Sequence, residues 1–148
     1  MLEKDVLLKE LTASIKGEFA ANSPAAMEIA EKAYEMGQNF AKTKRFDNSR
    51  FYHNYQFRLD DGSTVMSSNF FNIFTSRNQT GAYMDAEKAL RPFFQDAEND
   101  TIFRLVRDKR IGINGAFKAV MSPSEPQQLN YPDFVLVIAA FCAGVVNK

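Results

Sequence analysis

A predicted β-hairpin between residues 50 and 77 constrains the fold of this chain more than any other segment. Asp61-Gly62 is a strong signal for a hairpin turn, and apolar residues recur at alternate positions on both sides of it. Because two strands alone are marginally stable in water, the hairpin requires a covering helix, a third strand or another chain. Seven of the nineteen aromatic residues of the chain fall in this segment: Phe51, Tyr52, Tyr55, Phe57, Phe70, Phe71 and Phe74.

The register of the hairpin divides its side chains between two faces. A tight turn at Asp61-Gly62 pairs residues whose numbers sum to 123, so that Phe57 lies opposite Met66. One face is then mostly apolar along its whole length, which favours burial against the rest of the protein. The other face is polar near the turn and apolar at its open end, and its candidate contact residues are Tyr52, Arg58, Phe71 and Ile73.

Two amphipathic helices are predicted before the hairpin. The first covers residues 2–15, where aliphatic residues recur at helical spacing: Leu2, Val6, Leu7, Leu11 and Ile15. The second has Ser23 as its N-cap and Pro24 at its first helical position, and it continues to about Phe40 or Lys44. Small residues on its apolar stripe allow another element to approach closely; the stripe consists of Met27, Ala30, Ala33, Tyr34, Gly37, Phe40 and Ala41.

Two further helices are predicted after the hairpin. Thr80 caps a helix over residues 81–97, and Pro92 is expected to kink or split it. Asp100 caps a helix over residues 101–111, although the same residues also suit a strand that continues to a turn at Asn114-Gly115. The inner positions expected for the 81–97 helix are Met84, Ala89, Leu90, Phe93 and Phe94.

The longest apolar run of the chain lies near its C-terminus. A loop over residues 122–132 contains three prolines, and Asp133 after it caps a helix over residues 134–146. Thirteen apolar residues are too few to span a membrane, which needs about twenty. Because the helix is hydrophobic all round, we expect it to lie at the centre of the protein or against another subunit.

The amino-acid inventory excludes several classes of site. One His and one Cys are too few for a His-rich or Cys-rich zinc site. Cys142 lies inside the apolar run, where a thiolate is disfavoured, and His53 falls on the apolar face of the hairpin. We therefore predict no catalytic residues, no metal site and no cofactor. A single Cys and the absence of a signal-peptide pattern indicate a cytoplasmic, reducing location and no membrane partner.

Charge is segregated along the chain although the net charge is zero. Four basic and seven acidic residues precede residue 42, six basic and three acidic residues occupy 42–77, and five basic and one acidic residue occupy 101–118. Basic residues beside aromatic ones are typical of single-stranded nucleic-acid binding. The basic residues considered for contact with a partner, besides Arg58, are Arg77, Arg104, Arg107 and Arg110.

Together these patterns predict one α+β domain over residues 1–148, with about five helices around a small antiparallel sheet built on the 51–75 hairpin. The leading functional hypothesis is a non-enzymatic protein for protein–protein interaction or assembly, either a component of an oligomer or larger particle or a small inhibitor that docks on a larger protein. The first alternative is a nucleic-acid-binding protein that uses the hairpin and residues 104–118. The second alternative is an enzyme without a recognised motif.

Overall fold

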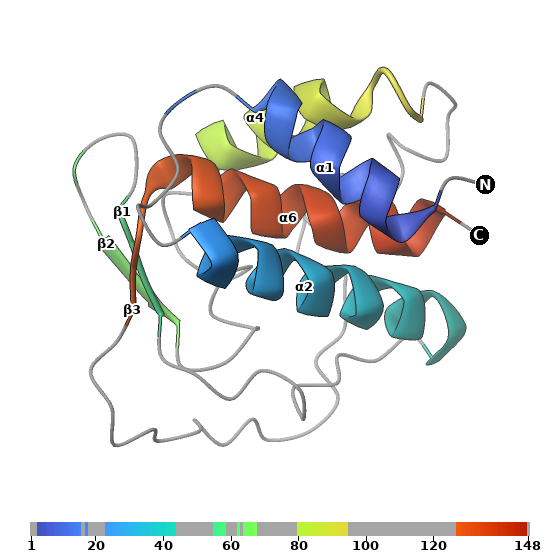
Figure 1. Cartoon of the computed structure of the whole chain (residues 1–148), viewed down its shortest axis with the longest axis horizontal. Coiled ribbons are helices and arrows are strands. Elements are labelled where there is room, and N and C mark those ends of the chain that lie inside the picture. Colours follow the sequence, from blue (N-terminus) through green and yellow to red (C-terminus); the bar gives the residue numbers. More distant parts are fainter. Residues whose placement is uncertain are drawn as a thin grey trace.

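The computed structural model describes residues 3–15, 17, 23–43, 55–58, 62, 64–67, 80–94 and 127–147. Helix α6 lies in the middle of the helical group, with α1, α2 and α4 beside it and the strands near its N-terminal end (Figure 1). In chain order, the elements are α1 (Lys4–Ser14), α2 (Ser23–Thr43), β1 (Tyr55–Arg58), β2 (Thr64–Ser67), α4 (Thr80–Leu90), β3 (Gln127–Leu129) and α6 (Tyr131–Val146).

Helix α6 forms the centre of the core. Residues 132–145 are all buried, so the helix has no solvent-facing side over almost its whole length. This burial confirms the central position expected for a helix that is hydrophobic all round, and the cover comes from within the same chain. None of the described helices is long and apolar enough to cross a membrane.

The start of α6 differs from the prediction. Asn130 is the N-cap, Pro132 lies in the first turn, and the buried Asp133 accepts a hydrogen bond from the Asn130 backbone N–H at 2.7 Å. A carboxylate that reaches back to the N-cap N–H is one half of a capping box. The prediction that Asp133 is itself the cap is therefore wrong, because the helix begins one turn earlier, where a proline-containing loop was expected.

Helices α2 and α6 cross at a pair of glycines. A Cβ on Gly37 would lie 2.1 Å from the Phe141 carbonyl oxygen, and a Cβ on Gly144 would lie 2.1 Å from the Tyr34 carbonyl oxygen. Real Cβ atoms do not approach other atoms so closely, so each glycine accepts the backbone of the opposite helix. The prediction that small residues on the α2 stripe permit close approach is confirmed.

The inner faces of α1 and α4 match the predictions only in part. On α1, Leu7, Leu8 and Leu11 are buried, whereas Val6 is 51% exposed. On α4, the predicted Ala89 and Leu90 are buried, but Met84 is 53% exposed. Val6 and Met84 were therefore wrongly placed, because short apolar patterns allow more than one helix face and neighbouring elements select among them.

Helix α4 ends at Leu90, two residues before Pro92. Proline disfavours helical geometry in the residue that precedes it, and it lacks the N–H that would continue the helix. The backbone N–H groups of Phe93 and Phe94 still donate to the Leu90 carbonyl at 3.0 and 2.9 Å, which turns the chain back towards the core. Both phenylalanines are partly buried against that core, and residues 95–97 of the predicted helix lie outside the described residues.

The three strands that the structure describes form a small sheet in the order β2-β1-β3. Strand β1 pairs antiparallel with β2 and parallel with β3, so the sheet is mixed. Phe57 lies opposite Val65 on β2 and beside Leu129 on β3. Because β3 is followed directly by the N-cap of α6, this pairing fixes the sheet to the beginning of the central helix.

The predicted α+β fold, with helices arranged around an antiparallel sheet, is wrong. Most of the described residues are helical, and the helices pack around α6 instead of covering a sheet. The predicted 51–75 hairpin is also wrong in register: the described ladder joins Tyr55–Arg58 to Thr64–Ser67, with Phe57 opposite Val65 and not Met66. Residues 51–54 and 68–75 of the predicted hairpin lie outside the described residues. A shift of one residue changes which residues of the two strands share a face, so the predicted division into faces fails.

Candidate functional site

A pocket of about 750 Å³ lies where the end of α1, helix α4 and the beginning of α6 meet. We call it the junction pocket. Its volume falls in the range of pockets that hold small-molecule ligands, about 300–1,000 Å³. Its described lining consists of Ser14, Ile15, Gly17, Asp85, Lys88, Ala89, Pro92, Tyr131, Pro132 and Val135.

The α1 side of the junction pocket depends on how that helix ends. Ile15, the C-cap, has an extended backbone (φ −81°, ψ 124°), and its N–H donates to the Leu11 carbonyl at 3.1 Å. Gly17 then adopts φ +117°, and a Cβ there would lie 2.6 Å from Cγ of Pro132. Glycine at position 17 thus meets both requirements, a positive φ and close contact with the first turn of α6.

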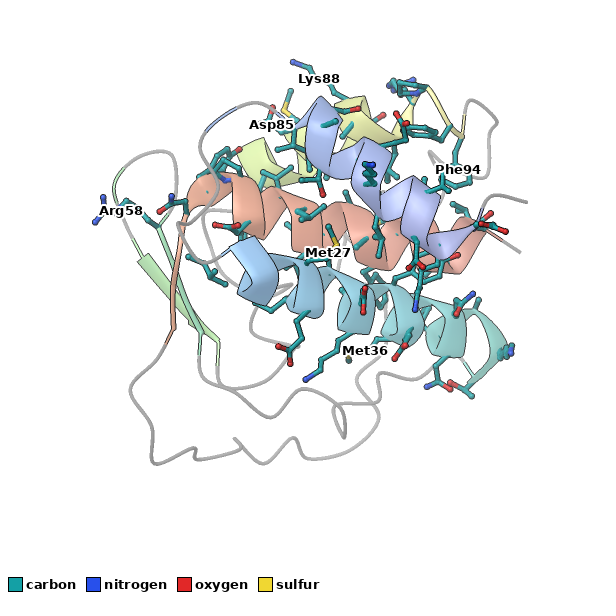
Figure 2. All side chains as sticks on the ribbon, in the orientation of Figure 1. Met27, Met36, Arg58, Asp85, Lys88 and Phe94 are labelled. Atoms are coloured by element: carbon teal, nitrogen blue, oxygen red, sulfur yellow. The ribbon has the colours of Figure 1, made fainter. Side chains whose placement is uncertain are left out.

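The α4 side supplies the charged groups of the pocket. Asp85, Lys88 and Ala89 are spaced by three and four residues on α4, so they lie along one side of the helix. Figure 2 labels Asp85 and Lys88 on this helix. Asp85 is half-buried and Lys88 is exposed.

Asp85 and Tyr131 form the polar contact at the base of the site. The Tyr131 hydroxyl donates a hydrogen bond of 2.6 Å to Oδ2 of Asp85 and joins α4 to the first residue of α6. A hydrogen bond to a carboxylate is shorter and stronger than one between neutral groups. Tyr131 is itself packed against the hydrophobic core, so the contact holds the Asp85 carboxylate in a fixed position.

Two polar side chains on the helices around the pocket, Glu87 and Ser14, already have partners. Glu87 pairs with Arg91, the first residue after α4, and the Ser14 hydroxyl donates to the Glu10 carbonyl at 2.9 Å. Lys88 has no hydrogen-bond or ion-pair partner among the residues that the structure describes. Within the same part of the chain, Tyr131 is the partner of the Asp85 carboxylate.

Cys142 does not contribute to this or any other surface. The side chain is fully buried in α6, and burial raises the pKa of the thiol above its ordinary value because the charged form would lose its hydration. The prediction that this thiol is buried and disfavours ionisation is confirmed. No group of three or more His, Cys, Asp or Glu residues within the described ranges is placed to hold a metal ion.

Most residues predicted as contact sites lie outside the described residues: Tyr52, Phe71, Ile73, Arg77, Arg104, Arg107 and Arg110. Arg58, at the end of β1, is exposed. The role of these residues in binding a partner or nucleic acid stays a prediction. His53 and Asp61, the first residue of the predicted turn, likewise lie outside the described residues.

The residues of the junction pocket were missed in the sequence. Asp85 and Tyr131 are 46 residues apart, and no local motif connects them. The one available signal was Asp85, Lys88 and Ala89 on one side of a predicted helix, a pattern that describes most solvated helix faces as well. Comparisons of the chain with protein families, with curated proteins and with solved structures found no match.

Proposed function

We propose that this protein is a non-enzymatic interaction protein that receives a segment of a protein partner in the junction pocket. The observation that carries the proposal is the pocket itself, which combines an apolar wall with a carboxylate held in place by Tyr131. Recognition sites commonly have this composition, because apolar surface supplies affinity and a few fixed polar groups supply orientation. A cytoplasmic location, inferred from the single cysteine of the sequence, is part of the proposal.

The polar groups of the pocket support binding better than covalent catalysis. A nucleophile is normally activated by a base within hydrogen-bond reach. The Ser14 hydroxyl instead donates to a backbone carbonyl, and the Tyr131 hydroxyl, which does meet the Asp85 carboxylate, is used to join α4 to α6. The Cys142 thiol lies outside the pocket and is buried inside α6. The described polar groups of the pocket therefore suit recognition of a partner.

The structure also changes which features support an interaction role. The all-apolar C-terminal helix had suggested a missing subunit, but α6 is covered by its own chain. The sheet is small, but it is joined to the start of α6. The proposal consequently depends on the junction pocket and no longer on an uncovered hydrophobic helix.

Site-specific photo-crosslinking in the native cell tests this proposal. A benzophenone amino acid at position 88, at the exposed edge of the pocket, is expected to give a discrete protein adduct. The same amino acid at Lys42, an exposed position in the last turn of α2, serves as the positional control.

A pocket-obstructing variant decides whether an adduct reflects use of the pocket. Ser14 is exposed and lines the pocket, so Ser14→Trp is expected to obstruct it and abolish the adduct at position 88. Thr43→Trp is the matched control, because Thr43 is also an exposed helical hydroxyl residue that donates to the carbonyl four residues earlier. Absence of an adduct specific to position 88, or an adduct that survives Ser14→Trp, overturns the proposal.

A further inference from the structure

We infer that the junction pocket selects a partner segment that presents a lysine or arginine side chain, and that Asp85 binds its cationic group. This inference rests on the proposed function and specifies the chemistry of the segment. In this arrangement the ammonium or guanidinium group of the partner donates to the Asp85 carboxylate. The aliphatic stem of the same side chain lies along the apolar wall of the pocket.

The Asp85 carboxylate has unused capacity to accept hydrogen bonds. An ionised carboxylate offers about four lone-pair positions on two oxygens. The Tyr131 hydroxyl occupies one of them, at Oδ2, and within the described residues no further partner of Asp85 is found. A cationic donor can therefore bind without displacing the contact that holds α4 to α6.

The surroundings of Asp85 suit a side chain with an aliphatic stem. Ile15, Ala89 and Val135 are buried or nearly buried residues on the wall, and Pro92 and Pro132 add further apolar surface. Lysine and arginine place their methylene groups on apolar surface while their charged ends reach a polar partner. A half-buried carboxylate also attracts a cation more strongly than a fully hydrated one, because the effective dielectric constant is lower.

The cations of α4 do not neutralise Asp85 internally. Arg91, the first residue after α4, is paired with Glu87. Lys88 is three residues from Asp85 but forms no ion pair with it, and its side chain is exposed. The described part of the chain thus leaves the carboxylate to an external cation, and Lys88 acts as a weak competitor at the edge of the pocket.

An anionic partner is the opposite possibility, with Lys88 and the N-terminus of α6 as its binding groups. The structure favours it less, because the side chain of Asp133 already accepts the Asn130 N–H and Pro132 has no N–H to donate. The Asp133 carboxylate also adds negative charge beside any anion at the N-terminus of α6. Anion binding is nevertheless a distinct outcome of the experiment below.

The test uses the full chain and small probes that mimic single side chains. Butylammonium and butylguanidinium represent the ends of Lys and Arg, butanol is the neutral analogue, and butyrate is the anionic one. Binding is followed by ¹H–¹⁵N NMR at the backbone amides of Asp85, Ala89 and Tyr131. Both cations are expected to shift these amides at lower concentrations than butanol, and butyrate is expected to bind most weakly.

Three variants identify the group responsible. Asp85→Asn keeps an oxygen that accepts from Tyr131 but removes the charge, and it should weaken cation binding about tenfold while leaving butanol unaffected. Lys88→Met removes the competing cation and should tighten binding of the cationic probes. Asp5→Asn makes the same chemical change at an exposed site on the first turn of α1, and should leave every affinity unchanged.

Three results overturn the inference: cations that bind Asp85→Asn as tightly as the parent, butyrate that binds more tightly than butylammonium, or no probe that shifts the pocket amides. The crosslink at position 88 separates this inference from the proposed function. An adduct that survives Asp85→Asn but not Ser14→Trp leaves the proposed function standing without the cation. If the cations bind tightly but no adduct forms at position 88, Asp85 does bind cations and the proposed function is wrong.

Discussion

At the scale of single residues, two glycines determine how closely α2 and α6, the two longest of the described helices, approach. Gly37 on α2 and Gly144 on α6 each accept the backbone of the other helix. Such contact brings Cα–H groups close to carbonyl oxygens and maximises packing between the helices. Side chains beyond the crossing then meet as well, and the rings of Phe40 and Phe141 lie with their centroids 5.9 Å apart.

Gly37→Ala tests this crossing through the sign of its effect. Helix propensity alone predicts a gain of roughly 0.5–1 kcal/mol when Gly is replaced by Ala inside a helix. A Cβ located 2.1 Å from the Phe141 oxygen forces the helices apart, so we expect a loss of about 2 kcal/mol in the free energy of unfolding. Urea unfolding measures this loss of stability, with Gln38→Ala at the neighbouring exposed position as control. A stabilised Gly37→Ala variant would contradict the close crossing.

Cys142 predicts how stability depends on pH. Burial raises the pKa of this thiol in the folded protein, whereas in the unfolded chain it has its ordinary value of about 8.5. Above that pH the unfolded state loses the proton and the folded state keeps it, so stability falls as pH rises. The decline attributable to the thiol is about 1.4 kcal/mol per pH unit above about pH 9.

The thiol contribution is isolated by comparing the parent with Cys142→Ala. Other groups that titrate in alkaline solution are common to both proteins, so the difference in their unfolding free energies should shrink with rising pH by the stated slope. A difference that stays constant between pH 8 and pH 10.5 would show that the thiol ionises in the folded protein too.

At the scale of elements, the neighbouring helices decide which face of α1 and of α4 is buried. The apolar residues of α1 and α4 were recognisable in the sequence, but Val6 and Met84 point to solvent while Leu8 and Ala86 are buried. Helical periodicity identified both helices because the pattern extends over several turns, although α4 ends at Leu90 and not near residue 97 as predicted. It could not determine the inner face of α4, where three of the four residues described as buried are alanines.

Leu90→Ala and Met84→Ala form a matched pair on α4. Leu90 is fully buried, so removing its side chain should leave a cavity and cost about 3 kcal/mol. Met84 is 53% exposed, so its truncation should change stability by less than about 0.5 kcal/mol. Thermal or urea unfolding of both variants is the measurement. Similar losses in the two variants would mean that α4 is rotated about its axis relative to the described structure.

The sheet shows why element prediction failed elsewhere. Asp61-Gly62 indicated a turn, but a turn signal does not determine register when the loop can change length by one residue. β3 gave no usable signal, since Gln127–Leu129 is three residues long and follows a proline-rich stretch. Its pairing with β1 joins residues about seventy positions apart, which local sequence patterns cannot report.

At the scale of the whole molecule, α6 is the element on which the others pack. It contacts α1, α2, α4 and β1, and its residues from 132 to 145 are buried. Buried apolar surface is the largest favourable contribution to folding. The central helix should consequently be the last part of the molecule to lose its structure.

Native-state hydrogen exchange tests this expectation. Amides of residues 136–145 should exchange only through global unfolding, with a free energy equal to that obtained from urea unfolding. Amides of α1, which has one exposed side, should exchange faster through local opening. Exchange from α6 as fast as from α1 would contradict a core centred on α6.

The sequence by itself determined the central helix, because thirteen consecutive apolar residues can be stable in water only when covered on every side. It also determined the presence of α1, α2 and α4, the possibility of a close approach at Gly37, and the inert character of Cys142. Tertiary structure alone decided that the helices pack around α6, that the sheet is mixed, and that Asp85 meets Tyr131. Those features join segments distant in the chain, and their geometry depends on which surfaces bury each other, a property that no local pattern contains.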